Sequence, residues 1–392
     1  MNEILSSEAA LAAGLNFDCS CGRMHSVGIK KIILDKSAKD GVLEIARGFR
    51  QGKILLISDK NTYEVSGKNI ENHLLNNGLN TEMLVFDNEG TLVPDERAVG
   101  TILVECTNDV SLIVSIGSGT INDLGRFISS RIKIPYIIAA TAPSMDGYAS
   151  VVSPLIIKGF KKTFEAVYPY AVIADSDILK DAPIDMIRAG YGDILGKYTA
   201  LADWRLAKAI RNEYFCETSA QLVLNSLDKC IQCSDELISR DRKAVEKLFE
   251  ALLLSGIAMG LVGNSRPASG AEHHLAHFWE IDALKRGEEH PLHGNSVGAA
   301  TVVISTIYIL LKERLGDSMP DCGVPEPEVI QSLLKRVGAA STPAELGISK
   351  EVFRESVKHA MEVRPRYTVL HLAKKHEMLE ELADYLTEKF YS

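Results

Sequence analysis

The sequence lacks the features that direct a chain to nucleic acids or into a membrane. It has no run of Lys and Arg and no stripe of basic and aromatic residues, and its formal net charge of -9 repels a polyphosphate backbone. Its longest apolar stretch, residues 297–311, is shorter than the about 18 to 20 residues that span a bilayer. Its first residues lack a basic flank followed by an apolar core, which disfavours a signal peptide. We therefore expect a cytoplasmic, globular protein with a buried helix at residues 297–311, without a nucleic-acid partner or membrane insertion.

The sequence also lacks an even, paired set of cysteines. Its seven cysteines lie in a long chain without an export signal, which favours reduced thiols over a disulfide framework. Cys230 and Cys233 have the spacing of a redox or zinc half-site, but no second pair follows, so we interpret them as ordinary buried thiols. Cys19, Cys21 and His25 place soft metal ligands close together. Because a closed zinc site needs four ligands and no fourth is evident, a reduced turn is the preferred interpretation.

What is present is a chain of 392 residues, 46% hydrophobic and 24% charged, which is long enough for two domains. Short β-branched runs alternate with amphipathic segments in the first half, the pattern of parallel strands joined by crossover helices. A Pro- and Gly-punctuated, β-rich stretch follows at 143–180, and from residue 185 the chain is almost continuously helix-like. We predict an α/β nucleotide-binding domain at residues 1–180 and an all-helical domain at residues 181–392. The expected strands are residues 31–35, 53–59, 81–87, 111–117 and 134–140, with helices at 38–50, 62–77, 93–105 and 120–131.

A glycine-containing turn follows the fourth expected strand. Residues 117–119, Gly-Ser-Gly, lead into a predicted helix, where close backbone approach and free N–H groups suit a pyrophosphate. The turn is not the full G-x-G-x-x-G fingerprint, so a plain tight turn is an equal alternative. Residues 58–62 and 141–144 also follow expected strands, at the edge where open α/β sheets bind ligands. Asp59 is suited equally to an adenosine ribose and to capping the next helix.

Several histidines gather in the helical half. His273 and His277 lie four residues apart and project from one helical face, and His293 follows in a Gly-flanked turn. Asp193 lies at an expected helix start, where capping is its alternative role. Two imidazoles and one carboxylate form the ligand set of a catalytic cation that polarises a carbonyl or an alkoxide. Further histidines nearby leave other pairings open.

Taken together, these segments resemble one enzyme family. They are similar to the iron-containing alcohol dehydrogenase and dehydroquinate synthase superfamily, and most closely to its bacterial sn-glycerol-1-phosphate dehydrogenases. The segments that carry the resemblance are SDKNT (58–62), GSGTIND (117–123), TAPSMDGYAS (141–150), AGYGDILGKYTALADW (189–204), SRPASGAEHHLAH (265–277) and LHG (292–294). It covers nearly the whole chain, including residues 18–25. It implies an N-terminal Rossmann-like dinucleotide-binding domain, an all-helical C-terminal domain that binds metal and substrate, an active site between them, and a homodimer.

The resemblance also implies a role for each matching residue. Asp193, His273 and His293 would bind one divalent metal ion, and nickel, zinc and iron all suit two imidazoles and a carboxylate. Asp146 and His277 would be catalytic and would contact the substrate together with Asp193. The residues expected to line NAD(P) are Asp59, Gly117, Ser118, Gly119, Thr120, Ile121, Thr141, Ala142, Pro143, Ser144 and Ser150.

The implied reaction is the reversible, NAD(P)H-dependent reduction of dihydroxyacetone phosphate to sn-glycerol 1-phosphate, which feeds phosphoglycerolipid synthesis. The cation would polarise the carbonyl, hydride would reach C2, and the alkoxide would take a proton from water or through His277. Arg266 is our candidate for the substrate phosphate, with a bridge to a neighbouring carboxylate as its alternative role and Lys197 as a second candidate. Asp59 repels a 2′-phosphate whereas Lys60 offsets that charge, so both NADH and NADPH are expected.

Three other functions fit the same scaffold. They are a dehydrogenase of glycerol or another polyol, a dehydroquinate-synthase-like lyase, and a catalytically silent nucleotide sensor. The lyase is disfavoured because its family has a glutamate where this chain has Asp193. The segment SRPASGAEH favours a phosphorylated substrate over a polyol, and the intact ligand set disfavours a sensor.

Overall fold

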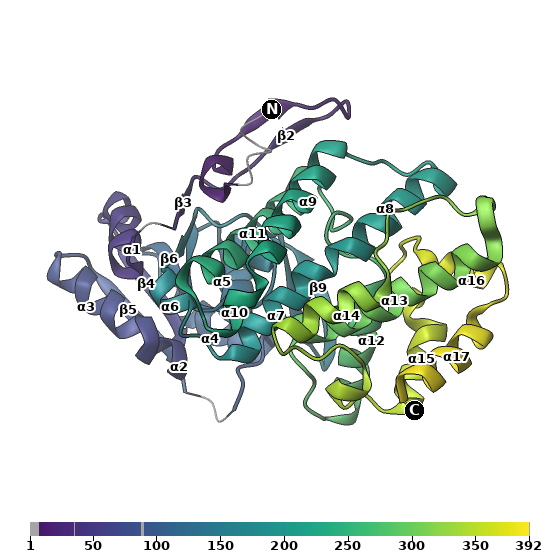
Figure 1. Cartoon of the computed structure of the whole chain (residues 1–392). Coiled ribbons are helices and arrows are strands. Elements are labelled where there is room, and N and C mark those ends of the chain that lie inside the picture. Colours follow the sequence, from purple (N-terminus) through teal and green to yellow (C-terminus); the bar gives the residue numbers. More distant parts are fainter. Residues whose placement is uncertain (1–7, 35, 88–89, 392) are drawn as a thin grey trace.

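The computed structural model describes residues 8–34, 36–87 and 90–391. A sheet surrounded by helices and a part made of helices alone lie side by side (Figure 1). The last strand of the sheet ends at Ala174, and the described chain from Ser176 to Tyr391 contains helices and loops without a strand. The α/β class predicted for the first part and the helical class predicted for the second are confirmed.

The sheet has six parallel strands in the order β3-β10-β7-β6-β4-β5. Their bounds are β3 (Lys31–Ile33), β4 (Lys53–Asp59), β5 (Thr81–Phe86), β6 (Val110–Gly117), β7 (Tyr136–Ala140) and β10 (Ala171–Ala174). The inner strands are apolar and buried along nearly their whole length, as parallel strands are when helices cover both faces. The chain places β5 on one side of β4 and β6 on the other, so the strand order reverses between β4 and β6. Open α/β sheets bind ligands at the carboxyl ends of the two strands that flank such a reversal.

All the strands expected from the sequence form in this sheet, within one or two residues of the expected ends; Asp35, the last residue of the first of them, lies outside the described residues. The structure adds β10, which the sequence placed inside the β-rich stretch at 143–180 without assigning it to the sheet. β10 is a short apolar run, and only its tertiary position between β3 and β7 makes it a central strand.

Helices connect the strands. Their bounds are α1 (Ala38–Ala46), α2 (Lys60–Thr62), α3 (Lys68–Asn76), α4 (Glu96–Glu105) and α5 (Gly119–Ile132). The single helix expected at 62–77 is interrupted by a π-helical turn, η4 (Tyr63–Gly67), in which the Tyr63 ring lies so close to Gly67 that a Cβ there would come within 3.1 Å of it. Asp95 caps α4 by accepting a hydrogen bond from the Ala98 N–H at 2.8 Å.

The β-rich stretch contains an antiparallel hairpin, β8 (Val152–Ile157) and β9 (Phe160–Glu165), joined by two residues of positive φ, Lys158 and Gly159. Lys161 on β9 reaches across to Glu280 in the helical part, with 2.6 Å between Lys161 Nζ and Glu280 Oε2. The hairpin thus links the two parts of the molecule.

The helical part is built around long buried helices. Its bounds are α6 (Ser176–Leu179), α7 (Ile184–Leu195), α8 (Lys197–Arg211), α9 (Glu217–Gln232), α10 (Ser234–Ile238), α11 (Arg242–Val262), α12 (Ala271–Arg286), α13 (His293–Leu315), α14 (Pro327–Arg336), α15 (Lys350–His359), α16 (Val369–Lys375) and α17 (Leu379–Tyr391). By length and composition α13 and the turn after it could cross a membrane, but 83% of its apolar window is buried inside the protein. It is the core helix expected at residues 297–311.

Helices α7 and α13 touch backbone to backbone. A Cβ at Gly192 would lie 2.3 Å from Gly294 O, and a Cβ at Gly294 would lie 1.8 Å from Ala189 O, so only glycine permits this approach. Asp193 follows Gly192 and His293 precedes Gly294. The contact therefore brings a carboxylate and an imidazole together from distant parts of the chain.

The first described residues form a short turn, η2 (Ala9–Ala12), and a hairpin of β1 (Asn16–Asp18) and β2 (Met24–Ser26). This N-terminal hairpin lies at the top of Figure 1, beside α9 and α11. The Ala9 N–H donates to Glu250 Oε1 of α11 at 2.7 Å, and Ala9 and Ala12 belong to the same apolar core as α9 and α11. The hairpin precedes the sheet in sequence but packs with the helices that follow it.

Candidate active site

Asp193, near the end of α7, lies in a buried network of charges. Lys197 Nζ is 2.7 Å from Asp193 Oδ1 and 2.8 Å from Asp146 Oδ2, and the Asp193 and Lys197 side chains are both inaccessible to solvent. Asp193 Oδ2 accepts a hydrogen bond from the Asp146 N–H at 2.9 Å, and Ser255 Oγ donates to Asp146 Oδ2 at 2.9 Å. The loop that follows β7 is therefore attached to this network through Asp146.

His273 faces the same carboxylate from the first turn of α12. Its Nε2 is 3.6 Å from Asp193 Oδ1, and its Nδ1 is 2.8 Å from Glu272 Oε1. Glu272 is itself fixed, because Thr199 Oγ1 donates to its Oε2 at 2.7 Å and the Gly270 N–H donates to its Oε1 at 2.6 Å. A carboxylate that holds Nδ1 in this way orients Nε2 toward a metal ion in many metal sites.

His277 and His293 share a second buried carboxylate, Glu280. His277 Nδ1 is 3.1 Å from Glu280 Oε2, and His293 Nδ1 is 2.6 Å from Glu280 Oε1. The two rings stack with centroids 5.1 Å apart. Arg364 Nη2 lies 3.0 Å from His277 Nε2, and because a guanidinium only donates hydrogen bonds, that nitrogen is the acceptor. His277 therefore carries its proton on Nδ1, toward Glu280.

His273 lies next to both of the other predicted metal ligands. The His273 and His293 ring centroids are 5.3 Å apart, and Asp193 contacts His273. Among the described residues of this region, the group whose ligand atoms all lie within 4.8 Å of one another is His277, Glu280 and His293. Asp193, His273 and His293 are not such a group in the described chain, Lys197 pairs with Asp193 Oδ1, and this ligand set stays a prediction. A glutamate holds Nδ1 of both predicted histidine ligands and leaves Nε2 free to bind, so the donor set fits a divalent cation.

Electrostatics assign charges to these groups. Burial raises the pKa of Asp193, but the charge of Lys197 and the hydrogen bond with His273 outweigh burial and hold that pKa well below its ordinary value. Burial lowers the pKa of Lys197, whereas Asp146 and Asp193 raise it above its ordinary value. Burial, with the charge of Lys161, lowers the pKa of His277 well below its ordinary value. At neutral pH, Asp193 is an anion, Lys197 a cation and His277 neutral.

Arg266, the candidate for the substrate phosphate, does not face this group. Its Nε donates to Glu213 Oε1 at 2.6 Å and its Nη1 to Tyr367 O at 2.8 Å, which is the alternative role that the sequence left open. Arg364 contacts His277 instead, and in the described chain it has no carboxylate within ion-pair distance. Sequence reasoning missed Arg364, because it lies 87 residues beyond His277 in a segment without a motif. Glu280 was also missed, although its i, i+3 spacing from His277 was an available signal.

The residues expected to line the nucleotide lie together at the carboxyl edge of the sheet, where the strand order reverses. Gly117 ends β6, and a Cβ there would lie 2.8 Å from Ile121 Cβ, so the turn requires glycine. Ser118 precedes α5 without a side-chain cap, which leaves the N–H groups of the first turn for an anion. Asp59 ends the neighbouring strand β4 and caps α2 through the Thr62 N–H at 2.8 Å. Capping occupies only its Oδ1.

The other predicted nucleotide residues belong to the segment after β7. Residues 141–144 begin at the end of that strand, where the Thr141 N–H donates to Gly117 O at 3.1 Å. Ser150, 6% exposed, accepts from the Val152 N–H at 3.1 Å. Arg126 of α5 fixes the same segment by donating to the carbonyl oxygens of Gly147, Tyr148 and Val152. The segment thus joins the glycine turn to Asp146 and, through it, to Asp193, a predicted metal ligand.

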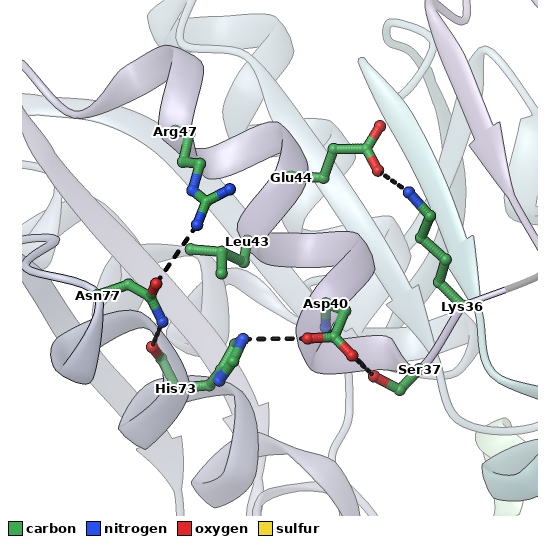
Figure 2. Close-up of a pocket in the computed structure, with 8 residues that line it drawn as sticks. All are labelled: Lys36, Ser37, Asp40, Leu43, Glu44, Arg47, His73 and Asn77. Atoms are coloured by element: carbon green, nitrogen blue, oxygen red, sulfur yellow. Dashed lines mark hydrogen bonds and ion pairs between the residues drawn. The ribbon is translucent and has the colours of Figure 1, made fainter.

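A separate hollow of about 740 Å³ lies between α1 and α3 (Figure 2). Its polar side chains are paired with one another: His73 Nε2 is 3.1 Å from Asp40 Oδ1, Lys36 pairs with Glu44, and Arg47 donates to the Asn77 side chain. It contains no predicted site residue, and most of its polar side chains are already paired with one another.

Comparisons with known proteins show what the chain is similar to. Residues 36–183 match the model of a family described as iron-containing alcohol dehydrogenase. The chain is 35% identical to the glycerol-1-phosphate dehydrogenase [NAD(P)+] of Geobacillus thermodenitrificans, over 97% of this chain and 100% of the relative. It is 33% identical to the enzyme of the same name from Methanosarcina barkeri, over 84% of this chain and 88% of that protein.

Solved structures share the fold at lower identity. A glycerol dehydrogenase from Schizosaccharomyces pombe superposes with a TM-score of 0.68 at 19% identity, covering 91% of this chain and 90% of its own. A maleylacetate reductase from Agrobacterium tumefaciens superposes with a TM-score of 0.70 at 16% identity, covering 92% of this chain and 96% of its own. At these identities the likeness concerns the fold alone.

Proposed function

Because the chain belongs to the glycerol-1-phosphate dehydrogenase family, among the iron-containing alcohol dehydrogenases, we propose that it uses NAD(P)H and a divalent metal ion to reduce dihydroxyacetone phosphate to sn-glycerol 1-phosphate. One hydride from the nicotinamide and one proton convert the ketone to the alcohol, and the reaction is reversible. NADH and NADPH are both proposed as hydride donors, and nickel, zinc and iron as the metal ion.

The observation that carries this proposal is the hydrogen bond from the Asp146 N–H to Asp193 Oδ2, 2.9 Å long. Asp146 lies two residues beyond the segment 141–144, which follows a sheet strand at the edge where such sheets bind nucleotides. Asp193 is one of three proposed metal ligands. A nucleotide along that segment would therefore end beside the metal ligands, as hydride transfer to a metal-bound ketone requires.

The charges of the site residues support a proposed role for each of them. Asp193, His273 and His293 hold a divalent cation, which supplies a Lewis acid for the carbonyl oxygen while NAD(P)H supplies the hydride. Lys197 keeps Asp146 and Asp193 in place by bridging them. In each proposed histidine ligand a glutamate oxygen lies within hydrogen-bond distance of Nδ1, which would leave Nε2 as the nitrogen for the cation.

We further propose Arg364 as the cation that binds the substrate phosphate. Its guanidinium contacts His277, the predicted substrate contact. Burial lowers the pKa of Arg364, which indicates that nearby carboxylates do not fully balance its positive charge. Phosphate is a natural partner for such a guanidinium. Drawing Arg364 onto a phosphate would also release His277 Nε2 for a substrate hydroxyl.

Two further features of the proposal concern the whole chain. Among the described residues, the one helix apolar enough to span a membrane is mostly buried in the protein, and a soluble, cytoplasmic enzyme is proposed accordingly. A homodimer is proposed from the family resemblance, and light scattering coupled to size-exclusion chromatography would test it.

The test is an assay of metal-depleted protein with dihydroxyacetone phosphate and each nicotinamide cofactor, restored with Ni²⁺, Zn²⁺ or Fe²⁺. We expect activity to return only with a metal ion, and to be absent in Asp193→Ala and His273→Ala at every metal concentration. His290→Ala is the matched control, because His290 is exposed and bonds only to the Pro291 carbonyl. Full activity in both ligand variants would disprove the proposed site.

The substrate is tested in the same assay with dihydroxyacetone. We expect the phosphorylated ketone to be reduced with the higher kcat/KM. An equal or higher kcat/KM for dihydroxyacetone would instead support a polyol dehydrogenase. Binding of nucleotide without turnover of either ketone would support a silent sensor.

A further inference from the structure

A second group of metal-binding side chains lies far from the histidine site, where the N-terminal hairpin meets the start of α9. Cys19, Cys21 and His25 come from the hairpin, and the structure adds Cys216, the residue just before α9. One ligand atom from each of the four lies within 4.8 Å of the others. Cys216 is the fourth ligand that the sequence did not reveal, because it is 191 residues away from His25.

Three of the six separations among these atoms match those of a tetrahedral zinc site, and all six are within 4.8 Å. Zn–S bonds of about 2.3 Å and Zn–N bonds of about 2.0 Å place two sulfurs about 3.8 Å apart and a sulfur and a nitrogen about 3.5 Å apart. Cys19 Sγ and Cys216 Sγ are 3.8 Å apart, and His25 Nε2 is 3.3 Å from Cys21 Sγ and 3.4 Å from Cys216 Sγ. The sulfur–sulfur separation is far longer than a disulfide bond.

The surroundings are built to carry thiolates. Each sulfur has one further donor within reach: Thr218 Oγ1 is 3.3 Å from Cys19 Sγ, Tyr214 Oη is 3.1 Å from Cys21 Sγ, and the Ser219 N–H is 3.5 Å from Cys216 Sγ. Donors of this kind disperse the negative charge of metal-bound sulfur. The N-terminus of α9 points at the same group, and its dipole favours anions.

The histidine provides an independent observation. His25 is 1% exposed, its Nδ1 has no hydrogen-bond partner among the described residues, and the polar contacts of its Nε2 are with cysteine sulfurs. Buried imidazoles are normally satisfied by hydrogen bonds. This ring instead directs its one engaged nitrogen at the cysteine sulfurs.

We propose that Cys19, Cys21, His25 and Cys216 bind one zinc ion, which fastens the N-terminal hairpin to the helical part. Four protein ligands close the site to substrate, so its role is structural, and binding releases the three thiol protons to water. The hairpin has strands of three residues each, too short to be stable alone, and a cross-link over about 190 residues of chain restrains it strongly. This site is independent of the proposed dehydrogenase activity.

Cobalt substitution of the full-length wild-type chain tests the proposal directly. The histidine site contains no cysteine, so Co²⁺–thiolate charge-transfer absorption in the near ultraviolet reports only the cysteine site. We expect this absorption in Co²⁺-loaded wild type, and its loss when Zn²⁺ is added. Absence of thiolate absorption from the Co²⁺-loaded wild type would overturn the proposal without reference to any variant.

Variants then assign the ligands. Cys21→Ser and Cys216→Ser should each lose the thiolate absorption and one zinc ion per chain by elemental analysis, whereas Cys233→Ser should retain both. Cys233 is the matched control, because it is a buried cysteine that contacts backbone carbonyls outside the group. His273→Ala should retain the thiolate absorption, which separates this site from the proposed active site. An unchanged zinc content in folded Cys216→Ser, or a Cys19–Cys216 disulfide in the purified protein, would contradict the proposal.

Discussion

Arg266 and Arg364 lie in the same helical part, and their partners separate their roles. Arg266 is bound to Glu213 and to a backbone carbonyl, whereas Arg364 contacts the imidazole of His277. A neutral imidazole does not balance the positive charge of the guanidinium, so Arg364 can form an ion pair with an incoming anion. The substrate phosphate is the anion that the proposed reaction brings.

The first prediction concerns these two arginines. Arg364→Met should lower kcat/KM for dihydroxyacetone phosphate by about 10- to 100-fold, the value of one or two hydrogen bonds to a charged group, and leave kcat/KM for dihydroxyacetone nearly unchanged. Arg266→Met should lower the melting temperature without changing the ratio between the two substrates. Steady-state kinetics of both variants measure that ratio. If Arg266→Met alone changes it, the phosphate binds where the sequence first placed it.

Some features of single residues could not be predicted from the sequence. Asp193, His273 and His293 were selected by resemblance, because the spacing of several nearby histidines allowed other pairings. Glu272 lies in the quoted segment 265–277 and Glu280 three residues beyond it, but nothing in the sequence shows which way a side chain points. Cys216 could not be connected with the N-terminal cysteines at all, since only the folded chain brings them together.

At the level of helices, Asp203 of α8 joins three other helices. Its Oδ2 accepts from the Ala271 N–H, the first residue of α12, and its Oδ1 accepts from the Val369 N–H, the first residue of α16. The Tyr308 hydroxyl of α13 donates to the same Oδ1 at 2.7 Å. Burial, together with the nearby charge of Glu272, raises the pKa of Asp203 to about 7 in spite of these donors.

The second prediction is a pH dependence with a definite sign. An acid whose pKa is higher in the folded state stabilises folding while it is protonated, fully below its unfolded pKa of about 3.9, and loses that contribution as pH rises through its folded pKa. The free energy of unfolding of wild type relative to Asp203→Asn should therefore fall by roughly 1 kcal/mol per pH unit between pH 5 and 7. Urea titrations of both proteins at pH 5, 6, 7 and 8 measure the difference. A constant difference would show that Asp203 has the same charge in the folded and the unfolded state over this pH range.

The third prediction concerns the contact between α7 and α13. Gly294→Ala should destabilise the protein by about 1–3 kcal/mol, because the new Cβ meets the Ala189 carbonyl and pushes the two helices apart. It should also weaken metal binding, since His293 moves with α13. Gly100→Ala is the control: it lies within α4 with no atom within 4 Å of the new Cβ, and should stabilise by about 0.5–1 kcal/mol. Thermal melts with and without Ni²⁺ distinguish the two effects.

Elements were the scale at which the sequence was most informative. Strand β4 has the ends expected for it, and α5 begins and ends within a residue of its expected bounds, because short apolar runs and helical periodicity are local signals. β10 was not assigned to the sheet, and the π-helical turn at 63–67 was not expected, because both depend on what packs against them. The glycine contact between α7 and α13 likewise leaves no local pattern.

At the scale of the whole molecule, one apolar cluster spans both parts, and two smaller clusters belong to the α/β part alone. Residues of the sheet, among them Ile138 of β7 and Val172 of β10, belong to the same buried cluster as the long helices α11 and α13. The N-terminal hairpin joins this cluster from the helical side, although it precedes the sheet in sequence. Lys161 on the β8–β9 hairpin adds an ion pair to Glu280 across the junction. The two parts therefore stabilise each other.

The last prediction follows from that shared core. Both tryptophans of the chain, Trp204 and Trp279, are buried in the helical part, so their fluorescence reports that part alone, whereas far-ultraviolet circular dichroism reports both. Because separating the parts would expose the shared cluster, urea should unfold them in one transition, with the same midpoint by both probes. Independent domains would instead give a biphasic dichroism curve, one phase of which lacks a fluorescence change. Lys161→Met, which removes an ion pair but leaves the apolar core, should shift the common midpoint without splitting it.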